Sequence, residues 1–185
     1  MRIVTLFRVT AGSILCACVG TFVLASPSHA ASGYPIKADS APNLCLDADT
    51  NTIYHNGTIV QLWTCTGAPN QQWRAGPGGS LINAQSGRCL DADLATIGLN
   101  GTRVQLWDCS GAINQRWVMP GFGIDAYWEV DSAYNQDGYQ CLDADDGATP
   151  SNPNLRILLH NGNKVQLWSC SGQPNQKWEG PDNPR

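Results

Sequence analysis

Polar and apolar residues alternate along short stretches of this chain, and the first clear stretch is residues 58–63, Thr-Ile-Val-Gln-Leu-Trp. Successive side chains of a β-strand point to opposite faces, so this stretch predicts a strand with Val60 and Leu62 on an apolar face. Gln61 and Trp63 share the other face, which is polar and aromatic. No stretch after the first thirty residues keeps the apolar period of an amphipathic helix. The alternation therefore predicts an all-β protein.

The same stretch returns twice, because most of the sequence consists of three copies of one unit. The copies run from Cys45 to Trp73, from Cys89 to Trp117 and from Cys141 to Trp178. Tandem copies build one structural element repeatedly, so the fold and any binding site are expected to be threefold. The corresponding repeats cover about 34–73, 74–117 and 118–178.

An Asn-Gly dipeptide stands before each alternating stretch, at Asn56, Asn100 and Asn161. Both residue types tolerate positive φ, so the dipeptide predicts a β-hairpin at each place. The first two dipeptides are also glycosylation sequons because Thr58 and Thr102 follow them, but the hairpin role explains them better.

The first thirty residues differ from the repeats and have the pattern of a secretory signal peptide. Two arginines flank the start, an apolar run covers residues 9–25, and residues 28–30, Ser-His-Ala, supply the small side chains of a cleavage site. We therefore expect cleavage after residue 30 and secretion of residues 31–185. The run is short for a membrane span, and a lipoprotein anchor at residues 15–18 is a minor alternative.

Six cysteines remain after this cleavage, two in each copy. In an exported chain an even number of cysteines predicts disulfides, and the repeat symmetry selects pairing within each copy. A metal site would need close cysteine pairs or added histidine ligands, which the spacing lacks. The predicted disulfides are Cys45–Cys65, Cys89–Cys109 and Cys141–Cys170.

Charge and motifs argue against several classes of function. Of the 11 Lys and Arg residues, two are lost with the signal peptide, which leaves 9 against 15 acidic residues. Nucleic-acid binding needs a basic surface, so it is not expected. The aspartates recur in triplicate, whereas a catalytic carboxylate pair is asymmetric, and no nucleophile elbow or phosphate loop is present. We expect no enzyme activity, no cofactor and no metal.

A Gln-x-Trp triplet closes each copy, ending at Trp73, Trp117 and Trp178, in register with Cys-Leu-Asp and Gln-Leu-Trp. Three such copies resemble the ricin B-chain type lectin family, which also supplies carbohydrate-binding modules to secreted glycosidases. The resemblance covers residues 34 to about 179. It implies a β-trefoil, a barrel capped by three hairpins with one four-stranded unit per copy. It also implies that the three tryptophans lie in the shared core.

The resemblance further implies a sugar site in each copy. In the first copy, Asp47 accepts hydrogen bonds from sugar hydroxyls and Trp63 stacks on the apolar face of the ring. Asn70 and Gln71 complete the polar grip, with Gln61 nearby. The matching residues are Asp91, Gln105, Trp107, Asn114 and Gln115 in the second copy, and Asp143, Gln166, Trp168, Asn175 and Gln176 in the third. Structural roles are the alternative, since Asp and Asn often satisfy turns and Trp often packs.

Two features make the copies unequal. An insertion at residues 146–159 lies beside the expected third site, where it can extend the site, occlude it or bind a partner. The spacer at residues 118–140 is rich in aromatic residues, and core packing and a second binding surface both fit it.

The second aspartate of each Cys-Leu-Asp-Ala-Asp motif is assigned to a solvated turn: Asp49, Asp93 and Asp145. Calcium is the alternative there, but it needs about six to eight oxygen ligands.

The sequence therefore predicts a secreted, non-enzymatic protein that binds galactose- or xylose-type glycans of a polysaccharide or glycoconjugate. Up to three weak sites would act together, and multivalent binding would raise their affinity. The alternative is a protein-binding trefoil, such as a protease inhibitor or a toxin or adhesion subunit. The residues name neither the sugar nor an associated enzyme or toxin.

Overall fold

The computed structural model describes residues 33–118, 129–130, 140–148, 151 and 157–180. Their thirteen strands belong to one hydrogen-bonded network, in which every paired strand is antiparallel. The strands are β1 Tyr34–Pro35, β2 Lys37–Ala38, β3 Ala41–Ala48, β4 Thr58–Thr64, β5 Gln72–Ala75, β6 Leu81–Asn83, β7 Cys89–Ala92, β8 Thr102–Trp107, β9 Trp117–Val118, β10 Glu129–Val130, β11 Gln140–Ala144, β12 Val165–Ser169 and β13 Trp178–Glu179. The short 3₁₀ turns are η1 Pro69–Gln71, η2 Pro77–Gly79, η3 Ile113–Gln115 and η5 Pro174–Gln176.

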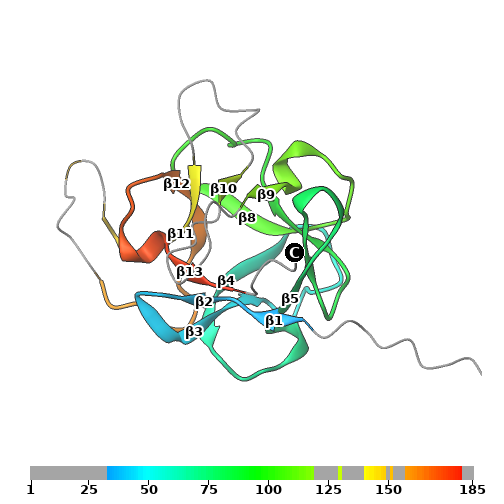
Figure 1. The fold of residues 1–185 in the computed structure, drawn as a ribbon, viewed down its shortest axis with the longest axis horizontal. Coiled ribbons are helices and arrows are strands. Elements are labelled where there is room, and N and C mark those ends of the chain that lie inside the picture. Colours follow the sequence, from blue (N-terminus) through cyan, green and yellow to red (C-terminus); the bar gives the residue numbers. More distant parts are fainter. Residues whose placement is uncertain (1–32, 119–128, 131–139, 149–150, 152–156, 181–185) are drawn as a thin grey trace, which may run out of the picture.

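Each copy contributes one long pair of strands, and the three pairs have the same register. Asp47 of β3 faces Gln61 of β4, and the same Asp–Gln pairing joins β7 to β8 and β11 to β12. Strand β8 also pairs with β4 and with β12, so the copies share one barrel. Figure 1 shows the copies in separate sectors, with the first in blue and cyan, the second in green and the third in orange and red. This arrangement is the β-trefoil that the family resemblance implies, with the threefold repetition that the three copies predict.

The core is built from the residue types that the alternation places inside. Val60 and Leu62 are buried and Trp63 is exposed, as the pattern of the first stretch predicts. The tryptophans of the Gln-x-Trp triplets are buried, and the indole Nε1 of Trp73 donates to the Leu46 carbonyl at 2.9 Å. Trp117 and Trp178 make the same bond to the equivalent leucine in their own copies. Because the polar edge of each ring is satisfied, its large apolar surface is buried at little cost.

The Asn-Gly dipeptides do not form the tight hairpin turns that the sequence predicts. Strands β3 and β4 are joined by residues 49–57, and the dipeptide lies at the end of this loop. Gly57 has φ of 87°, but no described non-glycine residue has positive φ, so Asn56 does not adopt the conformation of a type I′ turn. Instead, the asparagine of each dipeptide makes a side-chain contact with the next copy.

The side chain of each of these asparagines reaches the strand end of the neighbouring copy. Asn161 Oδ1 accepts from the backbone N–H of Thr64 at 2.7 Å and from its hydroxyl at 2.9 Å. Asn100 accepts the same two bonds from Ser169, and Asn56 Oδ1 accepts from the N–H of Asp108 at 2.8 Å. The third copy therefore binds the first, the first binds the second, and the second binds the third. These three contacts, here called the asparagine clasps, close a ring around the pseudo-threefold axis.

The within-copy disulfides form as the repeat symmetry predicts, between Cys45 and Cys65, Cys89 and Cys109, and Cys141 and Cys170. Several other predictions fall outside the described residues: the signal peptide, most of the spacer and part of the insertion. Of the insertion, Ile157 and Leu158 are exposed, while Leu159 packs against the core. Within the described ranges, no helix has the length and hydropathy of a membrane span.

Candidate functional site

Each copy gathers one carboxylate and three side-chain amides at the open end of its long strand pair. In the first copy, Asp47 comes from β3, Gln61 from β4, and Asn70 and Gln71 from η1. The antiparallel register places Asp47 directly opposite Gln61, so their side chains share a face. Pro69 fixes φ at the first position of η1, which turns the next two residues back toward the strands.

The carboxylate of Asp47 is held from three sides. Its Oδ2 accepts from Asn70 Nδ2 at 2.7 Å and from Gln71 Nε2 at 3.0 Å, and its Oδ1 accepts from Gln61 Nε2 at 3.3 Å. Only 5% of the residue is exposed. Four lone pairs on the two oxygens thus meet three donors, so Oδ1 retains capacity for one further donor.

The second copy repeats this geometry with closely matching distances. Asp91 Oδ2 accepts from Asn114 Nδ2 at 2.8 Å and from Gln115 Nε2 at 2.9 Å. Gln105 Nε2 donates to the other oxygen at 3.1 Å. Because the geometry repeats with the sequence, the arrangement follows from the residues that the copies share.

The third copy makes the same contacts despite its insertion. Asp143 Oδ2 accepts from Asn175 Nδ2 at 2.8 Å and from Gln176 Nε2 at 2.9 Å, and Gln166 Nε2 donates to Oδ1 at 3.2 Å. The insertion therefore leaves the carboxylate cluster intact.

The glutamine of each Gln-x-Trp triplet has all of its hydrogen-bonding capacity engaged within the protein. Gln71 Nε2 donates to Asp47 and to the Thr64 carbonyl, while Oε1 accepts from the N–H and the hydroxyl of Thr66. With 1% of its surface exposed, it has no donor left for a ligand. Gln115 and Gln176 form the equivalent bonds. The hydroxyl residue that directly follows the second cysteine of each copy is therefore part of the site's support. It recurs in every copy, at Thr66, Ser110 and Ser171, but the sequence alone does not indicate this role.

The asparagine that precedes this glutamine is also occupied. Asn70 Nδ2 donates to Asp47 and to the Ala48 carbonyl, at 2.7 and 3.0 Å, which uses both of its hydrogens. The second and third copies show the same pair of bonds. The two amides from each 3₁₀ turn thus hold the carboxylate in place.

A partly exposed tryptophan stands beside each held carboxylate. Trp63 is 40% exposed and Trp107 is 41% exposed, whereas Trp168 is half-buried. Each belongs to the same strand as the glutamine opposite the aspartate, two residues further along, so the ring and the amide share a face. The exposed part of each indole offers a flat apolar surface beside the carboxylate.

Carboxylate and tryptophan line a common cavity in each of the first two copies. The first cavity has a volume of about 500 Å³ and the second about 300 Å³. The first is lined by Asp47, Asp49, Thr50, Asn51, Gln61, Trp63, Thr66, Asn70 and Gln71. The second is lined by Asp91, Asp93, Leu94, Gln105, Trp107, Asp108, Cys109, Ser110, Ala112, Asn114 and Gln115. In each of these two copies, all five predicted site residues therefore line one cavity.

Burial raises the pKa of the three held aspartates above the usual carboxyl value. For Asp47 and Asp91 the desolvation is opposed by the amide hydrogen bonds, which favour the ionised form. For Asp143 the pKa reaches about 6, because burial is joined by the nearby charges of Asp146 and Asp145. The third site thus differs electrostatically from the first two.

The second aspartate of each motif caps the loop that follows it. Asp49 Oδ1 accepts from the N–H and the side-chain amide of Asn51, at 3.0 and 2.8 Å. Asp93 and Asp145 accept from the backbone two residues ahead in the same way. This is the turn role expected for these residues. In the described part of the chain, no group of three or more His, Cys, Asp or Glu side chains is arranged to bind a metal ion.

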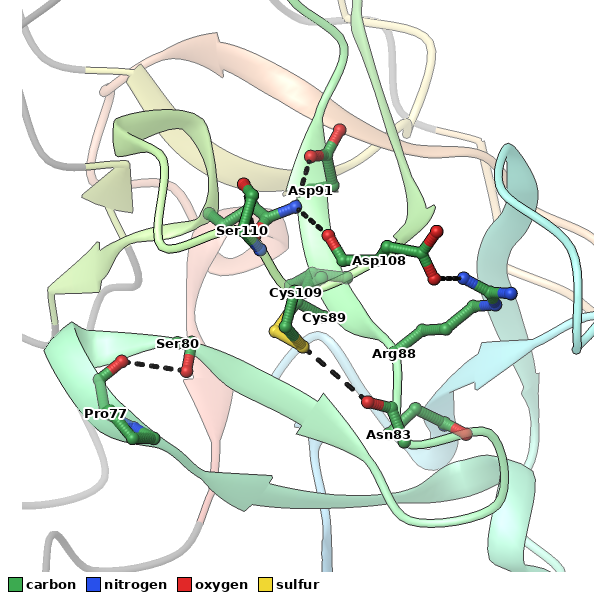
Figure 2. Close-up of a disulfide and its surroundings, with 12 residues drawn as sticks. Pro77, Ser80, Asn83, Arg88, Cys89, Asp91, Asp108, Cys109 and Ser110 are labelled. Carbon is green, nitrogen blue, oxygen red and sulfur yellow. Dashed lines mark hydrogen bonds and ion pairs between the residues drawn. A yellow bond between two sulfur atoms is a disulfide. The ribbon is translucent and has the colours of Figure 1, made fainter.

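An ion pair supports the wall of the second cavity beside its disulfide. Arg88 and Asp108 point toward each other next to the Cys89–Cys109 bond (Figure 2). The hydrogen bond from Asn56, followed by the contact with Arg88, holds the pKa of Asp108 below its usual value. The first asparagine clasp therefore carries a charge-assisted contact that the other two lack.

Comparison with known proteins agrees with this geometry. Residues 31–118 match the family described as ricin-type beta-trefoil lectin domain. A designed threefold symmetric protein, ThreeFoil, is 27% identical, with a TM-score of 0.63 over 81% of this chain and 98% of that one. No curated protein matches the chain.

Two natural proteins share the fold at lower identity. One is the beta-trefoil lectin of the Vibrio vulnificus hemolysin/cytolysin, solved with N-acetyl-D-lactosamine bound. It is 18% identical, with a TM-score of 0.59 over 84% of this chain and 98% of that one. The other is an exo-beta-1,3-galactanase from Clostridium thermocellum, which is 23% identical with a TM-score of 0.60. That match covers 83% of this chain but 30% of the enzyme.

Proposed function

Because residues 31–118 carry the sequence of a ricin-type beta-trefoil lectin domain, a carbohydrate-binding fold, we propose that this protein is a secreted lectin for galactose- or xylose-type glycans. Its sites are the cavities of the first two copies and the equivalent residues of the third, and its ligand is a polysaccharide or a glycoconjugate. It binds the glycan without chemical conversion.

The observation that carries the proposal is the pairing of a fixed carboxylate with an exposed indole in one cavity. A sugar ring has an apolar C–H face and a fringe of hydroxyl groups. Trp63 offers a flat apolar surface to the face, and Asp47 offers a charged acceptor to the hydroxyls. Since three amides prevent rotation of the carboxylate, the acceptor is oriented before the sugar arrives.

The predicted site residues divide into two roles under this proposal. The aspartate and the exposed tryptophan contact the sugar, with the opposing glutamine beside them. The amides of the 3₁₀ turn act through the aspartate, because their donors are already used. The contacting residues are Asp47, Gln61 and Trp63, then Asp91, Gln105 and Trp107, then Asp143, Gln166 and Trp168. The residues that hold the aspartate are Asn70 and Gln71, Asn114 and Gln115, and Asn175 and Gln176.

The disulfides and the neighbours support the remaining parts of the proposal. Three disulfides suit an oxidising extracellular environment, in agreement with the expected signal peptide. The hemolysin lectin was solved with N-acetyl-D-lactosamine, and the galactanase carries a similar fold beside its other parts. The carboxylates recur identically around the axis, which suits repeated binding better than one asymmetric reaction.

The test is binding to a glycan array, with competition by free monosaccharides. The variant Trp63→Ala/Trp107→Ala removes two exposed rings and should lose most of the retained glycan without loss of thermal stability. The matched control is Trp63→Phe/Trp107→Phe, which keeps an aromatic face and should retain partial binding. Asp39→Ala, in an exposed turn outside both cavities, should leave binding unchanged. Retention of no glycan, or equal retention by the double alanine variant, contradicts the proposal.

A second candidate function is favoured by one observation in the third copy. Leu158 is 91% exposed and lies beside Ile157, which is 45% exposed. Exposed apolar pairs of this kind suit contact with a protein partner, such as an enzyme or toxin subunit. If protein binding is the main function, Leu158→Ser should abolish partner capture and free sugar should have no effect on it.

A further inference from the structure

The first two cavities have the same floor but different rims. Their floors share one aspartate, one asparagine, two glutamines and one tryptophan. At the rim, the residue after the second aspartate is Thr50 in the first cavity and Leu94 in the second, and Asn51 lines the first cavity as well. The second cavity is also lined by Asp108 and Cys109, but on the loop that follows the second aspartate the difference is a polar Thr50 against an apolar Leu94.

The loop cap fixes which side chain stands at this rim. Asp49 N donates to the Ile59 carbonyl at 3.0 Å while Oδ1 accepts from the N–H of Asn51, so Thr50 is displayed between two anchored residues. Asp93 makes both contacts in the second copy, to the Arg103 carbonyl and from Ala95 N–H, each at 2.9 Å. Leu94 consequently occupies the place of Thr50 on an equally constrained loop.

Leu94 is 56% exposed although it lines a cavity with polar residues and an exposed ring. A sugar that presents only hydroxyl groups gains no apolar contact with this side chain. Any hydroxyl placed against the leucine loses water without gaining a hydrogen bond. A sugar that carries a methyl group at that position covers the leucine and gains apolar contact. At the first rim, Thr50 and Asn51 offer hydrogen bonds to hydroxyl groups instead.

We propose that the rim residue after the second aspartate determines sugar selectivity, and that the second site prefers sugars with a methyl-bearing substituent, such as an acetamido group or the C6 methyl of a 6-deoxy sugar. The first site prefers the unsubstituted, fully hydroxylated sugar. This inference rests on the proposed lectin function. With these two preferences, the protein would bind two chemically different sugars of one glycan surface.

The test uses proteins with a single intact site. Trp63→Ala/Trp168→Ala leaves the second site, and Trp107→Ala/Trp168→Ala leaves the first. Each is titrated by calorimetry with three sugar pairs: galactose with N-acetylgalactosamine, glucose with N-acetylglucosamine, and galactose with 6-deoxygalactose. For at least one pair, the second site should favour the methyl-bearing member about fourfold more than the first site does, the factor expected for one buried methyl group.

Reciprocal exchange of the rim residues completes the test. Leu94→Thr should remove the preference from the second site, and Thr50→Leu should confer it on the first. Leu99→Thr is the matched control, because Leu99 is 63% exposed but lines neither cavity, and it should change nothing. If both sites bind with the same ratio for every pair, the inference is wrong and the lectin function stands. If neither site binds any of the sugars, the lectin function itself fails, and the inference with it.

Discussion

A single carboxylate accounts for most of the polar organisation at each site. Asp47 is buried, yet it is not part of an ion pair within the described residues; its charge is compensated by three neutral amides. Burial raises its pKa, and the amide hydrogen bonds oppose this rise because they favour the ionised form. Under the proposed function, a sugar hydroxyl is the donor that fills the free position on Oδ1.

Substitution of the glutamine of the Gln-x-Trp triplet should test whether this residue positions the aspartate without contacting the sugar itself. In Gln71→Ala, four hydrogen bonds disappear, and the Thr66 N–H and the Thr64 carbonyl lose a partner. We expect a loss of about 1–3 kcal/mol in the free energy of unfolding and weaker sugar binding at the first site. The measurement is urea unfolding together with sugar titration.

The neighbouring glutamine provides the control for this variant. Gln72 is the central residue of the same triplet and its side chain is half-buried outside the Asp47 cluster. Gln72→Ala should therefore leave both the stability and the sugar affinity close to those of the unchanged protein. Equal effects of the two substitutions would show that Gln71 does not hold the carboxylate.

The third aspartate predicts opposite effects of pH on stability and on binding. The pKa of Asp143 is about 6 in the folded protein against 3.8 for an unperturbed aspartate. The folded state therefore binds more protons between these values, and stability falls as pH rises through this window, by up to about 3 kcal/mol from this group. Sugar binding at the third site needs the ionised acceptor, so it weakens as pH falls below about 6.

Unfolding of the protein and of Asp143→Asn at pH 5 and pH 7 checks this prediction. The variant should lack the part of the stability difference that comes from Asp143, so the gap between the two proteins should change with pH. Asp47 and Asp91 contribute in the same direction in both proteins and cancel in the comparison. A gap that is independent of pH would contradict the raised pKa.

At the scale of the elements, each site depends on the copy next to it. Strand β4 carries Trp63, and its end at Thr64 is held by Asn161 of the third copy. Backbone bonds accompany this clasp, from Gly162 N to the Leu62 carbonyl and from Leu62 N to the Asn163 carbonyl. The end of β4, which carries Trp63, is thus held by residues that are about a hundred positions away in sequence.

The asparagine clasps predict that a substitution in one copy disturbs the site of another. Asn161→Ala should shift the indole NMR signal of Trp63 and lower its sugar affinity, because the Thr64 N–H loses its acceptor. Asn56→Ala should act on Trp107 instead, since its partner is Asp108. Each variant is the control for the other, and each should cost about 1–2 kcal/mol of stability. If both variants shift the tryptophan of their own copy, the ring of clasps does not govern the sites.

At the scale of the whole molecule, repetition makes the fold predictable. The repeat symmetry of the cysteines predicts the within-copy disulfides, and the family resemblance carried by Cys-Leu-Asp, Gln-Leu-Trp and Gln-x-Trp implies the trefoil and the buried tryptophans. The clasps join different copies, so no local pattern identifies their partners. From the sequence alone, the Asn-Gly dipeptide therefore predicts a tight hairpin turn, whereas its asparagine contacts the next copy.

The candidate site was predictable in its membership but not in the division of its roles. The five residues of each copy meet at one cavity in the first two copies, as expected from the motif. That Gln71 has no free donor depends on Thr64 and Thr66, which only the folded strand end brings to it. The rim residues Thr50 and Leu94 were also not identified, because their relevance arises from the loop cap and not from their own chemistry.

The most direct test of the account is a sugar titration followed through the indole N–H signals of the individual tryptophans. Galactose, xylose and N-acetyllactosamine are the probes, and the signals are assigned with single Trp→Phe variants. We predict saturable shifts of Trp63 and Trp107, the exposed rings beside Asp47 and Asp91, with no comparable shift of the buried Trp73. If Trp63 and Trp107 remain unperturbed at saturating concentrations of every sugar, these cavities are not carbohydrate-binding sites.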